Sequence, residues 1–257
     1  MHPVRVDVVV GGASFTLRSY LAFLVLAALN LIGAVMVRAW LPLAKNFVRA
    51  EHLRQVLDHA KEHLRKPRLL ANFGMGATVL FALVGCFTYA NFYLAAAPFR
   101  LNSAQLGSIF FVYLLGVVIT PQSGRFLDHF GFRHTTILYC AMMIAGLLLT
   151  LVKSLPVVIV GLAIFSSGVF IAQAAATVQT GAIAGRARSS AAGLYVTFYY
   201  LGGTAGATLT GLFWRWKGWP GCVLLLGVVS LLSLWLARIS SRPLDQLDSA
   251  EIELVGD

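Results

Sequence analysis

The residues whose types and spacing could do chemistry are concentrated in one short segment, GRFLDHFGFRH, which begins at Gly124. Its single acid, Asp128, lies between Arg125 and Arg133. A carboxylate there can form a charge-assisted hydrogen bond with either guanidinium, or lie at the N-terminus of a neighbouring helix. Glycine at 124 allows helices to approach closely, and Gly131 permits a tight turn. Such a link could hold two helices together in one conformation and release them in another.

Few other residues are candidates for chemistry. All six histidines lie outside the long apolar stretches, which contain no Ser/His pair, paired aspartates or cluster of metal ligands. The three cysteines lie inside apolar stretches and are expected to be inert core thiols. Proton coupling normally needs an intramembrane carboxylate or histidine, and these stretches have neither. The sequence therefore predicts no enzymatic activity, no metal site and no cofactor.

The elements that must position these residues are long apolar helices. A helix needs about 20 predominantly apolar residues to cross a bilayer core. Stretches of roughly this length without a Lys, Arg, Asp or Glu occur seven times, at 19–37, 69–99, 101–124, 135–152, 154–185, 189–214 and 218–237. The sequence therefore predicts an all-α membrane protein with seven transmembrane helices. On the sixth, Gly202 and Gly206 form a small-xxx-small pair, which is typical of close contact between helices.

Composition and charge support this class of protein. Hydrophobic residues make up 58% of the chain and charged residues only 12%, against about 25% charged residues in soluble domains. The net charge of +10 could suggest nucleic-acid binding, but the cations lie in loops beside apolar stretches, where membrane topology explains them. We therefore expect the lipid bilayer, and not nucleic acid, to be a partner.

Lys and Arg are distributed unequally between the two sides of the predicted membrane. The connections on the side of residues 38–68 carry more than twice as many of them as the connections on the other side. The positive-inside rule predicts that this side, with the C-terminus, is cytoplasmic and that the N-terminus is periplasmic. Apolar residues at helical spacing within 38–68 predict a cytoplasmic linker that contains an amphipathic helix. We expect 69–238 to form a six-helix unit and 239–257 a cytoplasmic tail, whereas 1–18 match no pattern.

The segment that begins at Gly124 resembles the signature loop of the major facilitator superfamily of transporters, G-x-L-a-D-r-x-G-r-r. The residues that match it are Gly124, Asp128, Gly131 and Arg133. The pattern is closest to the weaker second copy of this loop, between family helices eight and nine. On this alignment the seven stretches are similar to family helices six to twelve. The last six would then form one half-bundle of two inverted three-helix repeats.

Residues 193–221 resemble helices eleven and twelve of bacterial efflux members, of the arabinose-efflux or multidrug type. The resemblance implies proton-coupled efflux of a small molecule, a sugar or a drug-like compound, across a bacterial inner membrane. It also implies a substrate cavity between two halves, which here would be lined mainly by 69–99 and 154–185. The candidate cavity residues are Tyr89, Asn91, Gln173, Thr177 and Tyr199. Hydrogen bonds between helices, or an interfacial anchor for Tyr89, are the alternatives.

The resemblance further implies that most of a first half is missing, since only 19–37 corresponds to a helix of that half. The sequence is therefore interpreted as a truncated transporter, with the missing N-terminal half as a possible partner. The alternative is a stand-alone seven-helix membrane protein, a receptor or partner subunit without transport activity. A retinal pump is excluded, because the last stretch has no lysine and no stretch has an aspartate.

Overall fold

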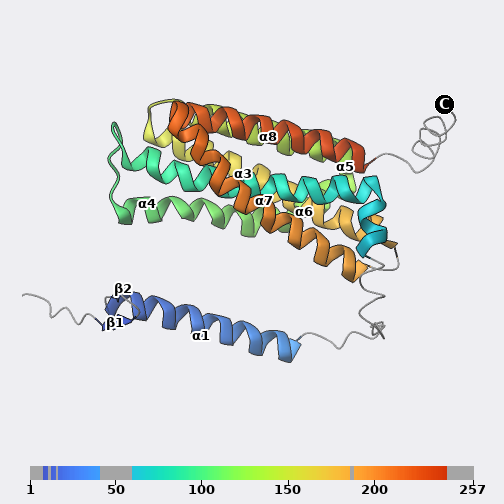
Figure 1. The fold of residues 1–257 in the computed structure, drawn as a ribbon, viewed down its shortest axis with the longest axis horizontal. Helices are drawn as coiled ribbons and strands as arrows, with labels where there is room; N and C mark the ends of the chain where they lie inside the picture. Colours follow the sequence, from blue (N-terminus) through green and yellow to red (C-terminus); the bar gives the residue numbers. More distant parts are fainter. Residues whose placement is uncertain (1–7, 11–12, 16, 41–59, 186–187, 242–257) are drawn as a thin grey trace, which may run out of the picture. The chain divides into compact units, whose positions relative to one another are not determined.

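The computed structural model describes residues 8–10, 13–15, 17–40, 60–185 and 188–241. They belong to two compact units, residues 1–50 and 51–257. In the first unit, the short strands β1 (Val8–Val10) and β2 (Ala13–Phe15) pair antiparallel ahead of α1 (Leu17–Trp40), as Figure 1 shows. Large apolar side chains are exposed along α1, as in a helix that lies against lipid.

The second unit is a bundle of long helices (Figure 1). Its elements are α3 (Pro67–Ala95), α4 (Ser103–Ile109), η1 (Phe110–Tyr113), α5 (Leu114–Leu149), α6 (Leu155–Ile183), α7 (Arg188–Lys217) and α8 (Trp219–Ser240). Helices α3, α6 and α8 each have a proline in the first turn, where the missing amide hydrogen has no intrahelical partner in any case. The amphipathic helix predicted within 38–68 falls largely outside the described residues, of which 60–65 are helical.

The predicted loop between 124 and 135 is wrong in extent, because helical residues cover almost all of it. The element α5 covers 36 residues and consists of two helices that meet at Gly131, which has φ 74° and ψ 165°. The two arms of α5 on either side of Gly131 both lie on α6. Gly116 contacts the ring of Phe170, and Gly146 contacts the backbone of Gly161. The connection is therefore a one-residue break, which we call the Gly131 turn.

Five of the described helical segments are long and apolar enough to cross a membrane: Phe23–Trp40, Pro67–Ala95, Ser103–Leu149, Leu155–Ile183 and Trp219–Ser240. The third has 47 residues and contains two of the seven predicted helices, one on each side of Gly131. Helix α7 has 30 residues, enough for a span, but its many Gly, Ser and Thr residues make it less apolar. The predicted helical membrane fold is confirmed. Ser103–Leu149 contains two of the seven predicted spans, the other four segments contain one each, and α7 corresponds to the remaining one.

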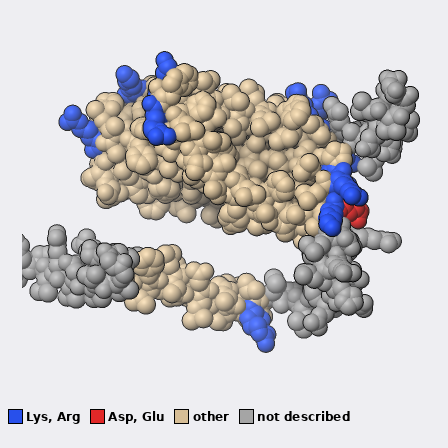
Figure 2. Space-filling view, in the orientation of Figure 1, with Lys and Arg blue, Asp and Glu red and all other residues tan. Residues whose placement is uncertain are grey.

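Contacts between the long helices form the core of the second unit. The most extensive contacts pair α5 with α6, and α3 with α7 and α8. Phe73, Tyr139 and Phe165 are among the largest fully buried side chains. In Figure 2 the described Lys and Arg residues of this bundle gather toward its two ends, with an uncharged belt between them. Many large apolar side chains are exposed, as lipid contact requires.

Candidate functional site

Helices α6 and α7 bring a set of polar side chains together against α3. The Tyr195 hydroxyl of α7 donates a hydrogen bond to Gln173 Oε1 of α6 at 3.0 Å. Thr177 Oγ1 donates to the Gln173 carbonyl oxygen at 2.9 Å, and Tyr199 stacks on Tyr195 with ring centroids 6.0 Å apart. Tyr195 is buried, and its ring lies directly against Gly76 of α3. We call the set of Gln173, Thr177, Tyr195 and Tyr199 the Gln173 cluster.

Aromatic side chains of α3, η1 and α6 also pack on one another. The Tyr113 ring packs edge-on against Phe87 of α3 and Phe170 of α6, with ring centroids 4.6 Å and 5.9 Å away. The predicted cavity set did not include Tyr195, whose hydroxyl binds Gln173. An aromatic residue within an apolar stretch gives the same sequence signal whether it faces lipid, core or cavity.

The other two predicted cavity residues lie elsewhere. The Tyr89 hydroxyl donates to the Ala207 carbonyl oxygen of α7 at 2.9 Å. Asn91 Nδ2 donates at 3.0 Å to the Phe87 carbonyl oxygen of its own helix. Tyr89 follows Gly76 by 13 residues on α3, which corresponds to about 20 Å along the helix. Three of the five predicted residues therefore share one cluster, and Tyr89 and Asn91 do not belong to it.

The charged residues near the Gly131 turn make no ion pair with one another. Asp128, Arg125 and Arg133 are all exposed, and within the described part of the chain the one ion pair joins Lys66 to Glu62 at 2.6 Å. A Cβ added at Gly124 would meet no atom within 4 Å. Neither the predicted Asp–Arg link nor a close helix approach at position 124 is therefore present among the described residues.

Replacing Gly131 with alanine should destabilise the bundle by about 1–3 kcal/mol, because the backbone angles at this position are essentially restricted to glycine. The expected result is a lower melting temperature, measured by circular dichroism on the detergent-solubilised chain. Gly124→Ala is the matched control, since position 124 is helical and open and alanine favours helix there. Equal melting temperatures for the two variants would contradict the expectation.

A second polar set joins three helices at the end of the bundle that contains the Gly131 turn. Buried Asn72 of α3 donates through Nδ2 to the Ala176 carbonyl oxygen at 2.9 Å and to Thr180 Oγ1 at 2.7 Å, both on α6. The Ser240 carbonyl oxygen at the end of α8 accepts from Arg68 Nε and Gln179 Nε2, each at 3.2 Å. We call these residues the Asn72 clasp. The clasp satisfies a terminal carbonyl that α8 itself leaves without a partner.

The small-residue pair of α7 lies where α7 approaches α3 most closely. A Cβ added at Gly202 would overlap the Ala77 carbonyl oxygen, and one at Gly206 would overlap that of Phe81. Both obstacles are backbone atoms of α3, which no side-chain rotation can move. Helices α3 and α7 can therefore keep this separation only if both positions lack a side chain.

The sequence model of the Major Facilitator Superfamily matches residues 84–253, which contain the Gly131 turn and the Gln173 cluster. The chain belongs to the Major Facilitator Superfamily. An "Uncharacterized transporter" of Buchnera aphidicola subsp. Schizaphis graminum is 31% identical over 224 residues, which cover 85% of this chain and 54% of the relative. The "Uncharacterized MFS-type transporter YybF" of Bacillus subtilis is 30% identical over 242 residues, or 94% and 60%. The "Inner membrane transport protein YnfM" of Escherichia coli is 29% identical over 216 residues, or 83% and 52%.

This superfamily chain spans roughly half the length of the curated relatives that it matches, 54% of one and 60% of another. Family membership and the apolar helices together make it a multi-pass membrane protein. The relatives named above are transporters by name. Among the described residues no group of three His, Cys, Asp or Glu side chains is placed to hold a metal ion.

Proposed function

We propose that this chain is part of a transporter that moves a small molecule across the membrane, with the Gln173 cluster as one wall of the substrate path. The hydrogen bond between Tyr195 and Gln173 carries this proposal, because it fixes a side-chain amide of α6 against α7 among largely apolar side chains. Gln173 and Tyr199 are only half-buried, so their polar groups can be reached from outside the bundle. Placing a polar side chain inside a membrane costs free energy, and such side chains commonly line the path of a substrate or ion.

The transport mode that we propose is proton-coupled efflux of a sugar or drug-like molecule across a bacterial inner membrane, with the C-terminus in the cytoplasm. The name of the Escherichia coli relative, an inner membrane transport protein, supports the location. The apolar stretches of this chain contain no acid or histidine. The titrating group would therefore belong to an N-terminal half, which would be the partner that supplies the opposite wall.

The Gly131 turn is proposed as the conformational switch of this transporter. Asp128 is exposed and has no ion-pair partner among the described residues. Its carboxylate is therefore available to a cation or a helix N-terminus on the other half in one conformation, and to water in the other. Gly124, Arg125, Gly131 and Arg133 would complete this switch.

Tyr195→Phe should lower the transport rate by about two- to tenfold, the usual effect of losing one hydrogen bond. The measurement is uptake of labelled sugars and of fluorescent drug-like cations into inverted membrane vesicles from cells that express the protein from its own locus. Tyr200→Phe is the matched control, because Tyr200 is on the same helix and is 64% exposed. Equal transport by both variants would contradict the role of the cluster. A wild-type protein that moves none of these probes would favour the receptor or partner-subunit alternative.

A further inference from the structure

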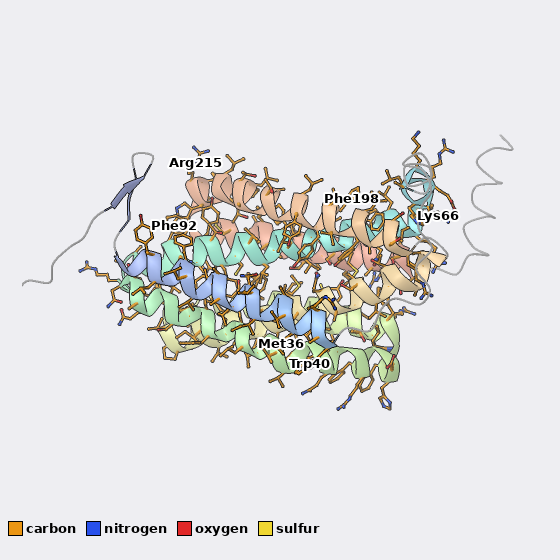
Figure 3. The ribbon with its side chains drawn as sticks, turned by 90° about the horizontal axis from the view of Figure 1, so that it is seen from below. Met36, Trp40, Lys66, Phe92, Phe198 and Arg215 are labelled. Carbon is orange, nitrogen blue, oxygen red and sulfur yellow. The ribbon has the colours of Figure 1, made fainter. Side chains whose placement is uncertain are left out.

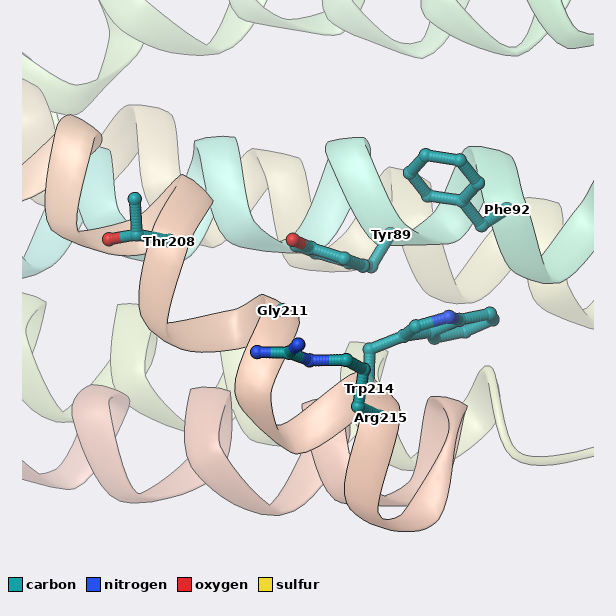
Figure 4. Close-up of a pocket in the computed structure, with 6 residues that line it drawn as sticks. All are labelled: Tyr89, Phe92, Thr208, Gly211, Trp214 and Arg215. Carbon is teal, nitrogen blue, oxygen red and sulfur yellow. The ribbon is translucent and has the colours of Figure 1, made fainter.

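A crevice opens between α3 and α7, near the end of the bundle that is remote from the Gly131 turn. Its volume is about 350 Å³, and Figure 4 shows the residues that line it. They are Tyr89, Phe92, Thr208, Gly211, Trp214 and Arg215. Figure 3 shows Phe92 and Arg215 toward one end of the second unit and Lys66 at the other. The crevice, which we call the Arg215 crevice, is therefore separate from the Gln173 cluster.

The aromatic walls of the Arg215 crevice hold one another in place. The ring centroids of Tyr89 and Trp214 lie 6.0 Å apart, and those of Phe92 and Trp214 6.2 Å apart. Tyr89 is fixed further by its hydrogen bond to the Ala207 carbonyl oxygen. Its hydroxyl lies directly against Gly211, where any side chain would displace it. The crevice is thus a formed feature with rigid apolar walls.

The charge of the crevice is positive and has no acidic counterpart. Glu62 and Asp128 are the only acids among the described residues, and both belong to the opposite end of the bundle. Arg215 is exposed and makes no ion pair within the described chain. In Figure 4 its guanidinium extends alongside Gly211 toward the Tyr89 side of the crevice. A guanidinium in this setting attracts an anion with two hydrogen-bond acceptors, such as a phosphate.

We propose that the Arg215 crevice binds an anionic phospholipid of the bilayer, with its phosphate at Arg215 and an acyl chain along the aromatic wall that contains Tyr89 and Trp214. Arg215 is two residues from the end of α7 at Lys217, the depth at which aromatic and cationic side chains meet the membrane–water interface. Lipid head groups lie at that depth. The positive charge of Arg215 matches the phosphate of such a lipid, and the apolar walls match its acyl chain.

The test uses phosphatidylglycerol with brominated acyl chains, which quenches tryptophan fluorescence on contact. The full chain in mild detergent is titrated with this lipid and with brominated phosphatidylcholine. The chain has five tryptophans, so the Trp214 signal is the difference between the wild-type chain and Trp214→Phe. We expect quenching of Trp214 at about fivefold lower concentrations of phosphatidylglycerol than of phosphatidylcholine, the usual effect of one cation near an anionic surface.

Arg215→Gln should abolish this preference, whereas Lys217→Gln should keep it, because the Lys217 ammonium lies over the Trp216 ring, 5.5 Å from its centroid. Equal quenching by both lipids, or a preference that survives Arg215→Gln, would overturn the proposal. Relief of Trp214 quenching by millimolar glycerol phosphate would also overturn it, since the occupant would then be a soluble anion. If Arg215→Gln does not fold, the comparison of the two lipids on the wild-type chain still tests whether the crevice prefers the anionic lipid. None of these readouts depends on transport.

Discussion

Gly202→Ala should unfold the helix bundle at a clearly lower temperature than the wild-type chain. A Cβ at position 202 would overlap the Ala77 carbonyl oxygen and would lie 2.5 Å from its carbonyl carbon and 2.6 Å from its Cα. These atoms belong to the backbone of α3, so the only relief is to move α3 and α7 apart. Overpacking of this kind costs about 1–3 kcal/mol. Thermal denaturation followed by circular dichroism in detergent measures the effect.

Gly193→Ala is the matched control for this prediction. Position 193 is on the same helix, and an added Cβ there would meet no atom within 4 Å. Alanine is a better helix former than glycine by up to about 1 kcal/mol, so Gly193→Ala should melt at the wild-type temperature or slightly above it. If Gly202→Ala melted together with Gly193→Ala, the close approach of α3 and α7 would not be a property of the folded protein in detergent.

The helices of this chain could be predicted from sequence because lipid imposes a simple condition on them. A segment that crosses a bilayer must be apolar over its whole length, so the stretch 69–99 anticipates α3, and 154–185 anticipates α6. The condition says nothing about where a helix stops once it has left the hydrocarbon. The two helices of α5 therefore both extend into a charged segment whose sequence predicts a loop, and they meet at Gly131.

The candidate site was less predictable, because it depends on which face of each helix meets which neighbour. Gln173 and Thr177 are four residues apart and therefore lie on one face of α6. Predicting the inward face of this helix correctly puts both residues in the cluster. Tyr89 and Asn91 are two residues apart and face different directions, and neither reaches the Gln173 cluster. The small-residue spacing of Gly202 and Gly206 is a local signal of close contact. The Asn72 clasp has no such signal, since the residues that its hydrogen bonds join across helices are more than 60 positions apart in the sequence.

Asn72→Leu should destabilise the end of the bundle that contains the Gly131 turn. Asn72 is fully buried, and its Nδ2 group supplies a donor to the Ala176 carbonyl oxygen and to Thr180 Oγ1. Its Oδ1 atom accepts from Ser240 Oγ at 3.5 Å. Leucine offers none of these contacts. Thr180 Oγ1 keeps its bond to the Ala176 carbonyl oxygen, but the buried Ser240 Oγ loses its partner out of reach of water. Leaving a buried group unsatisfied costs about 1–3 kcal/mol.

Asn91→Leu is the matched control, because Asn91 is on the same helix and bonds only to the carbonyl oxygen of Phe87 in that helix. We expect amide hydrogen exchange to accelerate at the ends of α6 and α8 in Asn72→Leu, and to stay at the wild-type rate there in Asn91→Leu. A uniform acceleration over all helices would instead indicate that Asn72 supports the bundle as a whole. Local acceleration would mean that the clasp holds α3, α6 and α8 together as a separate element. Its opening would then let α6, which carries Gln173, shift without disturbing the contact between α3 and α7 at Gly202.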